Sequence, residues 1–274
     1  MISIITAIHN GLHVNRLFYE SLEKYTLSPF ELIIIDNNST DGSREYFIQQ
    51  GAKVIQNKEN YSYPYCQNQG IEVAKGEWLA FLNNDIVVGK NWDLRLIMTA
   101  ELNGLEVITP CGIERLETKS ATKKARRRWK RIKTWVSLTR GKSQATLEKM
   151  VEKMYGNWEE FCEKRWKEFD NQVTEGFIGN TVLIKRSAIE KIGLWDERIQ
   201  AADFDLYIRV KKRSMEEGDI RPVHIALGVF NHHFIRLTVG SGPPEFADKE
   251  KLIRLEEKYT EKELKLYLKD NVST

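Results

Sequence analysis

Residues 78–85 read WLAFLNND, a run of five apolar residues that ends in three polar ones. A short uncharged run of this kind is typical of a strand buried on both faces of a sheet. Two earlier runs have the same form: Ile2–Ile8 precedes His9 and Asn10, and residues 32–35 precede Asp36, Asn37 and Asn38. The sequence therefore predicts three buried strands that each end in a polar cluster.

Stretches with helical spacing separate these strands. The predicted strands are 2–8, 32–35, 53–56 and 78–82, and the predicted helices are 15–25, 41–50 and 64–75. This alternation indicates an α/β fold with a mainly parallel sheet and helices on both faces. Ligands bind such sheets outside the carboxyl ends of the strands, so we expect the three polar clusters to line one site. The alternative is that Asp36 and Asp85 only cap the helices that follow.

Composition limits the class of protein. The 274 residues are 41% hydrophobic and 30% charged, which is ordinary for a globular chain and excludes a disordered or fibrous one. A net charge of +3 does not by itself imply a polyanionic partner. The three widely spaced cysteines, Cys66, Cys111 and Cys162, fit neither a disulfide framework nor a zinc cluster. With no long apolar run and no basic leader, we predict a cytoplasmic protein, with peripheral membrane contact as an open alternative.

Residues 118–147 contain no Asp or Glu and predict a basic amphipathic helix. The basic residues are Lys119, Lys123, Lys124, Arg126, Arg127, Arg128, Lys130, Arg131, Lys133, Arg140 and Lys142. One interpretation is a solvated helix face. The other is that 119–142 binds an anionic lipid surface, polyphosphate or nucleic acid, which Trp129 and Trp135 among the basic residues favour. Of these two tryptophans, only one need face the partner.

The rest of the chain completes the predicted domain. Apolar residues from Met150 to Phe169 form one stripe, so we predict a second helix there and a helical insertion over 114–172. Further strands are predicted at 181–184 and 223–230, and a single amphipathic helix at 247–269. The predicted organisation is a sheet domain over 1–243 with a C-terminal helix or tail over 244–274.

Several familiar sites are missing from the sequence. No G-x-G-x-x-G follows the first strand, which disfavours a nicotinamide or flavin site. Gly141-Lys142-Ser143 resembles the end of a phosphate loop, but Val136 stands where its first glycine is required. Neither H-E-x-x-H nor G-x-S-x-G is present, so zinc proteases and hydrolases with a nucleophile elbow lack support.

Four side chains are candidates for chemistry. Asp85 at a strand end could hold Mg²⁺ or Mn²⁺ while leaving positions for a diphosphate. Asp203 could be a general base, with Asp205 as a helix cap or ion-pair partner of Arg209; alternatively both are first-turn carboxylates favoured by the helix dipole. His232 and His233 could supply a metal ligand and a structural neighbour.

Taken together, these residues resemble the family-2 glycosyltransferases. The resemblance rests on His9-Asn10, 35–43 (IDNNSTDGS), Asn60, 68–70 (NQG), 76–85 (GEWLAFLNND), Gly179, 193–197 (GLWDE) and 203–206 (DFDL). It covers residues 1 to about 110 and 174 to about 240, and excludes 114–172 and the tail. The sequence departs from the family pattern at Asn83 and Asn84 in the metal motif, and at Ser62, Cys66 and Ala202.

The resemblance implies a GT-A fold, an inverting mechanism, a donor that is a UDP- or dTDP-linked sugar, and Mn²⁺ or Mg²⁺ as cofactor. Asp36 would bind the nucleoside, and Asp203 would be the catalytic base. The donor-binding residues would be Thr6, Ala7, His9, Asn10, Asp36, Asn38, Asn68, Asn84 and Gly179. Asp85 would be the main metal ligand, with His232 or His233 nearby. The acceptor would be a saccharide, a lipid-linked molecule or another hydroxyl compound.

Two other functions stay open on sequence alone. A nucleotidyltransferase also uses a metal and a nucleotide at a sheet edge, but it needs a glycine-rich or basic phosphate loop after the first strand, and residues 8–11 (IHNG) do not supply one. A catalytically degenerate domain could instead bind a polyanion or nucleic acid through residues 119–142 alone.

Overall fold

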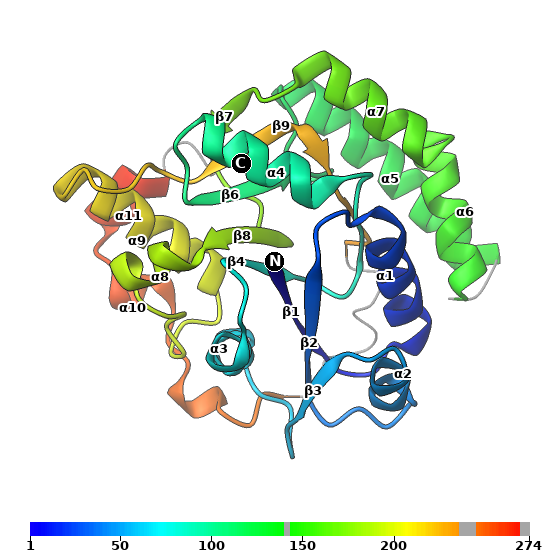
Figure 1. Ribbon diagram of the computed structural model, residues 1–274, viewed down its shortest axis with the longest axis horizontal. Coiled ribbons are helices and arrows are strands. Elements are labelled where there is room, and N and C mark those ends of the chain that lie inside the picture. The colour runs from blue at the N-terminus through cyan, green and yellow to red at the C-terminus, as the bar shows by residue number, and fades with distance from the viewer. Residues whose placement is uncertain (140–142, 236–244, 269–274) are drawn as a thin grey trace.

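The computed structural model describes residues 1–139, 143–235 and 245–268 (Figure 1). Its main sheet has eight strands in the order β3-β2-β1-β4-β8-β6-β9-β7. These strands are β1 (Ile2–Ile8), β2 (Phe30–Asp36), β3 (Lys53–Gln56), β4 (Trp78–Leu82), β6 (Val107–Cys111), β7 (Val173–Glu175), β8 (Thr181–Lys185) and β9 (His224–Phe230). A separate two-stranded sheet pairs β5 (Ile86–Val87) with β10 (His232–His233).

Helices surround the sheet. They are α1 (Leu12–Tyr25), α2 (Ser43–Gln49), α3 (Tyr63–Val73), α4 (Trp92–Leu102), α5 (Lys119–Thr139), α6 (Gln144–Tyr155), α7 (Trp158–Phe169), α8 (Arg186–Ile192), α9 (Ala202–Glu216), α10 (Leu255–Lys258) and α11 (Glu261–Leu268), with a short 3-10 helix η1 (Lys249–Lys251).

The sheet is mixed but mainly parallel. Strands β3, β2, β1 and β4 are parallel neighbours, and β9 is parallel to β6. Strand β8 runs antiparallel between β4 and β6, and β7 is antiparallel to β9 at the edge. The predicted α/β fold is confirmed, and the strands predicted at 2–8, 53–56 and 78–82 have the predicted bounds.

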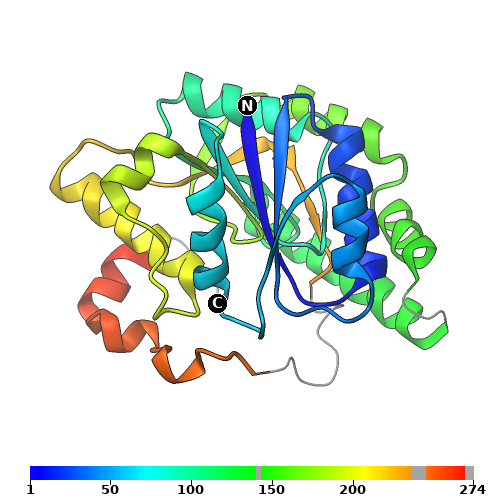
Figure 2. The same cartoon turned by 60° about the horizontal axis from the view of Figure 1, so that its bottom comes forward.

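Alternation along β1 divides the core between the two faces of the sheet. Ile4 and Ile8 pack with α1, α2 and α4, whereas Ile5 packs on the opposite face with α3, α8 and α9. Figure 2 shows these two helical layers on either side of the strands. Because both faces are covered, the strands are nearly continuous apolar runs, and polar side chains are left to gather at the strand ends.

The insertion forms three helices where the sequence predicted two, a basic helix and one helix over the apolar stripe. The stripe from Met150 to Phe169 is divided by Gly156, which has a φ of 75° and ends α6. Met150, Met154 and Trp158 still share one core, because α6 and α7 fold against α1, α5 and β9. Figure 1 shows α5, α6 and α7 together at one side of the sheet. Among the described residues, no helix is both long and apolar enough to cross a membrane.

The predicted single helix at 247–269 is wrong. The described part of this tail consists of η1, α10 and α11, joined by extended turns. Its backbone groups bond to the domain: Ala247 N donates to Asn60 O, and Ile253 N donates to Arg198 O. A continuous helix would have to give up these tertiary hydrogen bonds, so the tail stays divided.

Candidate functional site

One buried amide joins the ends of three strands. Asn15 of α1 donates from Nδ2 to Ser43 Oγ at 2.8 Å and to Asn10 O at 3.1 Å, and its Oδ1 accepts from Asn84 Nδ2 at 2.7 Å. The turns after β1, β2 and β4 are therefore connected through a single side chain. Their predicted convergence at one edge of the sheet is confirmed. Asn15 itself was not among the predicted site residues.

The turns after β1 and β2 also hold each other directly. His9 Nδ1 lies 2.6 Å from Asn37 O, a contact that fits a ring with its proton on Nδ1. Asn10 N donates to Ser39 Oγ, and Thr40 N donates to Asn10 Oδ1, both at 2.8 Å. Asn10 and Asn38 have φ values of 58° and 62°, in the left-handed region that Asn tolerates better than most residues. The side chain of Asn38 is exposed to solvent.

The predicted nucleoside residues lie next to these turns. Ile8 pairs with Asp36 in the β1–β2 register, so Thr6, Ala7 and Asp36 occupy the last positions of neighbouring strands. Asp36 is fully buried; Oδ1 accepts from Ser39 N at 3.1 Å, and Oδ2 lies 3.5 Å from Arg44 Nη1. Thr6 Oγ1 is buried and makes no hydrogen bond within the described part of the chain.

The small sheet brings Asp85 and His233 together. In its register His233 pairs with Ile86, and Phe234 N donates to Asp85 O. His233 Nε2 lies 3.1 Å from Asp85 Oδ1, and its Nδ1 contacts Glu114 Oε1. Burial alone would lower the pKa of His233, but the two carboxylates, Asp85 foremost, raise it to about 10.

Glu114 is a site residue that the sequence did not reveal. It lies in the turn before α5, and Asn180 Nδ2 donates to its Oε1 at 3.0 Å. Its other oxygen, Oε2, is buried and has no hydrogen-bond partner among the described residues. No local pattern marks this glutamate, because only the pairing of β5 with β10 brings His233 to it.

His232 belongs to the core of the insertion. Its ring lies within 5 Å of the rings of Trp129 and Phe234, and its Nδ1 is 2.9 Å from Tyr155 Oη. Burial lowers the pKa of His232 to about 3, so its ring is neutral. Of the two histidines predicted near the metal, His233 is therefore the one that contacts Asp85, and His232 packs behind it.

The donor atoms around Asp85 fit a hard divalent cation in their chemistry. Within the described ranges, no three His, Cys, Asp or Glu side chains are already arranged to hold a metal ion. His233 nevertheless contacts two carboxylates through its two ring nitrogens, Asp85 through Nε2 and Glu114 through Nδ1, and a cation held by Asp85 and His233 would displace the proton from Nε2. Such oxygen-rich sets suit Mn²⁺ and Mg²⁺, and the unsatisfied Glu114 Oε2 leaves a buried acceptor there.

Asp203 lies in the first turn of α9 against a glycine. Its Oδ1 accepts a hydrogen bond from Phe204 N at 2.9 Å. A Cβ atom added to Gly179 would lie only 2.2 Å from Asp203 Oδ2, so a larger residue would displace the carboxylate. Burial raises the pKa of Asp203. The pKa of Tyr63 is raised by burial first and also by the nearby charge of Asp203. Gly179 thus contacts the predicted base, which gives it a second role beside the predicted donor binding.

Asn68 holds a loop in place. Its Nδ2 donates to Trp195 O and to Glu197 Oε1, both at 2.9 Å, and its Oδ1 accepts from Trp195 N at 3.0 Å. These bonds connect α3 to the loop that leads to α9. Its predicted contact with the donor stays a prediction, while its loop-holding contacts are established by the geometry.

Because burial raises the pKa of Asp203, its charged form lowers the stability of the folded protein. We expect Asp203→Asn to raise the melting temperature at pH 7, because the folded state raises the pKa of Asp203 and so disfavours its charged form. In the wild type, the free energy of unfolding falls as pH rises from the pKa of Asp in the unfolded chain, about 3.9, through the raised pKa of Asp203 in the folded protein. Melting curves of both proteins at pH 3.5 and pH 7 test this: the gain should vanish at the lower pH. An equal or lower melting temperature for the variant at pH 7 would contradict it.

A comparison with protein families identifies the family of this chain. The model of Glycosyl transferase family 2 matches residues 3–193, which include the strand ends and Asp85. The chain belongs to glycosyl transferase family 2. The family resemblance predicted from the motifs is confirmed, whereas α9, with Asp203, and the tail lie beyond the matched residues.

Curated relatives of this glycosyltransferase agree with that assignment. The uncharacterized glycosyltransferase RT0329 of Rickettsia typhi is 25% identical over 215 residues, which cover 76% of this chain and 58% of that protein. The putative glycosyltransferase EpsH of Bacillus subtilis is 29% identical over 103 residues, or 36% of this chain and 30% of that protein. The chain thus spans less than two thirds of the length of each relative.

Solved structures show the same fold. The chain is similar to GalNAc-T7, solved with UDP, GalNAc and Mn²⁺, with a TM-score of 0.59 and 14% identity over 90% of this chain and 46% of that one. It is also similar to a mannosyltransferase from Pyrobaculum calidifontis, solved with GDP-Man and Mn²⁺, with a TM-score of 0.51 and 14% identity over 82% and 56% of the two chains. These likenesses establish a GT-A-like fold.

Proposed function

We propose that this protein is an inverting glycosyltransferase that moves a sugar from a nucleoside-diphosphate sugar to an acceptor hydroxyl. The observation that carries the proposal is Asp203, a carboxylate in the first turn of α9 whose pKa burial raises and whose place is kept open by Gly179. A general base works best when its pKa is near the working pH, so a carboxylate with a raised pKa suits proton removal from a hydroxyl.

The donor would lie over the carboxyl ends of β1, β2 and β4. In this proposal Thr6, Ala7, His9 and Asp36 contact the nucleoside, while Asn84 and Asp85 face the diphosphate. The support is the network through Asn15, which fixes these turns relative to one another before any donor arrives. Preorganised turns reduce the entropy lost on binding. UDP and dTDP are the nucleotides that we propose for the donor.

A divalent cation would complete the diphosphate site. Asp85 and His233 would hold it, with Glu114 beside them, and two structures of similar fold contain Mn²⁺. When bound, such an ion neutralises charge on the departing diphosphate. The chain itself would hold Asp85 at the strand end, through the pairing of β10 with β5 and the hydrogen bond from Phe234 N to Asp85 O.

Asp203 would perform the transfer step. Its carboxylate accepts the proton of the acceptor hydroxyl as that oxygen bonds to the anomeric carbon. The bond from that carbon to the diphosphate oxygen breaks on the opposite face, so the anomeric configuration inverts. Acid–base assistance of this kind contributes about 10²–10⁴-fold to a rate.

A ligand screen tests the donor proposal. Nucleoside diphosphates and their sugars are added with Mn²⁺, and the shift in melting temperature is recorded. A ligand at 100 times its Kd stabilises the folded state by about 2.7 kcal/mol, which is easily seen. Stabilisation by one nucleotide class, and its loss on chelation of the metal, would support the proposal. No shift with any nucleotide would contradict it.

The outer face of α5 favours an anionic partner on the acceptor side. Helix α5 packs inward through Trp129, whose ring centroid is 4.9 Å from that of His232. The opposite face carries a surface hollow of about 500 Å³ lined by Ser120, Lys123, Lys124, Arg127, Arg128 and Arg131. Arg140 and Lys142 lie outside the described residues, as does the side chain of Trp135. We propose that this face binds the anionic acceptor or the membrane surface that carries it, with nucleic acid as the alternative partner.

The structure selects which charges to remove. Arg126 Nη2 donates to Glu114 O and Arg128 Nη2 donates to Lys153 O, so both hold the helix on the domain and are left intact. The variant therefore replaces Lys123, Lys124, Arg127 and Arg131 with Gln. A control variant replaces four exposed lysines elsewhere: Lys58, Lys149, Lys164 and Lys167.

We expect the basic-face variant to lose at least about tenfold in affinity for anionic vesicles, since each basic residue near such a surface contributes about 1 kcal/mol. Its release of nucleoside diphosphate from the donor should be unchanged, and wild-type vesicle binding should weaken as salt rises. Vesicle sedimentation, oligonucleotide binding and donor hydrolysis are measured for both variants. Equal vesicle binding by both variants would refute the proposal, and loss confined to oligonucleotides would favour a nucleic-acid-binding domain.

A further inference from the structure

The C-terminal segment 245–268, here called the strap, contacts both sides of the proposed site. At its start, Asp248 accepts from Ser62 N at 3.0 Å and from Ser62 Oγ at 2.5 Å. Ala247 N donates to Asn60 O at 2.7 Å. The strap therefore begins at the N-terminus of α3, next to the turns that follow β2 and β3.

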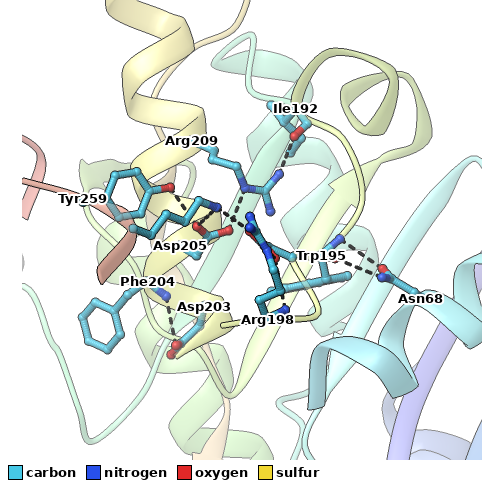
Figure 3. A network of polar contacts seen from close by, with 11 residues as sticks. Asn68, Ile192, Trp195, Arg198, Asp203, Phe204, Asp205, Arg209 and Tyr259 are labelled. Carbon is cyan, nitrogen blue, oxygen red and sulfur yellow. Dashed lines mark hydrogen bonds and ion pairs between the residues drawn. The ribbon is translucent and has the colours of Figure 1, made fainter. Parts of the chain in front are cut away.

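The middle of the strap, at Lys258 and Tyr259, reaches a fully buried carboxylate on α9, that of Asp205 (Figure 3). Tyr259 Oη donates to Asp205 Oδ1 at 2.7 Å, and Lys258 Nζ lies 2.5 Å from the same oxygen. Arg209, one turn along α9, donates from Nε to Asp205 Oδ2 at 2.7 Å. Burying a carboxylate costs free energy unless hydrogen-bond donors satisfy its oxygens. Two of the donors to Asp205 come from the strap.

The strap also holds the loop that enters α9. Lys258 Nζ bonds to Asp196 Oδ2 at 2.8 Å, and Ile253 N donates to Arg198 O at 2.7 Å. On its other side the same loop is bonded to Asn68 of α3. The loop and the first turn of α9 are thus held between α3 and the strap.

This arrangement bears directly on Asp203. Asp203 and Asp205 are two positions apart on α9, so their side chains leave the helix about 200° apart. Figure 3 shows Asp205 directed toward Tyr259, with Asp203 on another side of the helix beside Phe204. Any shift of the first turn that follows the loss of strap contacts to Asp205 would move the Asp203 carboxylate by a similar amount.

We propose that Lys258 and Tyr259 are positioning residues that align Asp203 for transfer by holding Asp205. The inference rests on the proposed function, in which Asp203 is the base. It assigns a catalytic purpose to a segment outside the residues that match the family model. The competing explanation is that the strap only adds to the core, since Tyr259, Tyr267 and Leu268 are all buried against α9.

Three variants separate these explanations. Tyr259→Phe removes the hydroxyl, Lys258→Met removes the charge, and Lys258→Arg restores a cation at the same position. The control is Tyr267→Leu, which weakens strap packing without touching Asp205. For each protein we would measure kcat for transfer, KM for the donor, and melting temperature.

We expect Tyr259→Phe and Lys258→Met to lower kcat by about 10- to 100-fold, since misplacement of a catalytic group by about 1 Å costs a rate factor of this size. Donor KM should stay within about twofold, and Lys258→Arg should recover most of the lost rate. A decrease in kcat no larger than that of Tyr267→Leu at the same loss of melting temperature would overturn the proposal.

Backbone hydrogen exchange in the first turn of α9 gives a readout that does not depend on the reaction. Exchange at residues 204–206 should quicken in Tyr259→Phe and Lys258→Met but not in Tyr267→Leu. Unchanged exchange would refute the positioning role even if a different reaction were found. Faster exchange in a protein that turns over no nucleotide sugar would leave the strap's hold on α9 intact and refute the proposed function instead.

Discussion

Asp203→Asn is expected to lower the rate of sugar transfer by about 10²–10⁴-fold while leaving donor affinity unchanged. The amide has nearly the same shape as the carboxylate and can still accept from Phe204 N, but it cannot take a proton from the acceptor. The effect should therefore appear in kcat, because proton removal belongs to the transition state and not to donor binding.

The matched control is Asp170→Asn. Asp170 is exposed beyond the end of α7 and has a φ of 43°, a conformation that Asn also tolerates. Turnover and nucleotide affinity are compared for wild type and both variants. Near-normal turnover in Asp203→Asn would remove this carboxylate from the mechanism.

Asp85→Ala is expected to weaken donor binding by at least about tenfold in Mn²⁺, and to have little effect in the presence of a chelator. The reason is that Asp85 Oδ1 lies 3.1 Å from His233 Nε2 at the strand end. Even indirect partners of a metal site change metal affinity by about 10–100-fold. Calorimetric titration of the donor with and without metal measures both numbers.

The chelated titration is the internal control for Asp85→Ala, and Asp170→Asn again controls for the loss of one negative charge. An equal loss of affinity in both titrations would show that Asp85 contacts the donor or supports the fold without a metal. Donor affinity of Asp85→Ala equal to that of wild type in Mn²⁺ would show that Asp85 does not bind the cation.

The sequence predicted the sheet well because its strands are local features. Residues 78–82 are buried on both faces, so a short apolar run with polar ends is enough to mark the strand. The same holds for 2–8, whereas 53–56 is a short edge strand whose two end residues are exposed. The strand ends were predicted with them, since the position of Asp36 and Asp85 follows directly from where each apolar run ends.

Long-range contacts were beyond the reach of local patterns. Asn15 and Asn84 are 69 positions apart in the chain, and Lys258 and Asp205 are 53 apart. Glu114 lies 119 positions from His233 and shares no motif with it. Each of these contacts depends on which strands pair and which helices pack, so no periodicity in the sequence announces it.

Helix boundaries in the insertion and tail failed for a related reason. The apolar stripe continues across Gly156 because α6 and α7 bury their stripes in the same core, although the helix axis breaks between them. In the tail, a helical pattern was outweighed by hydrogen bonds from Ala247 and Ile253 to the domain. Tertiary contacts decided both outcomes.

We propose that this chain transfers sugar from a nucleotide donor with Asp203 as the base. The most direct measurement is the release of free nucleoside diphosphate from a panel of nucleotide sugars with Mn²⁺, for wild type and Asp203→Asn side by side. We expect metal-dependent release from at least one donor by wild type, and a release that falls sharply in the variant. Absence of release from every donor, or equal release by the two proteins, would contradict it.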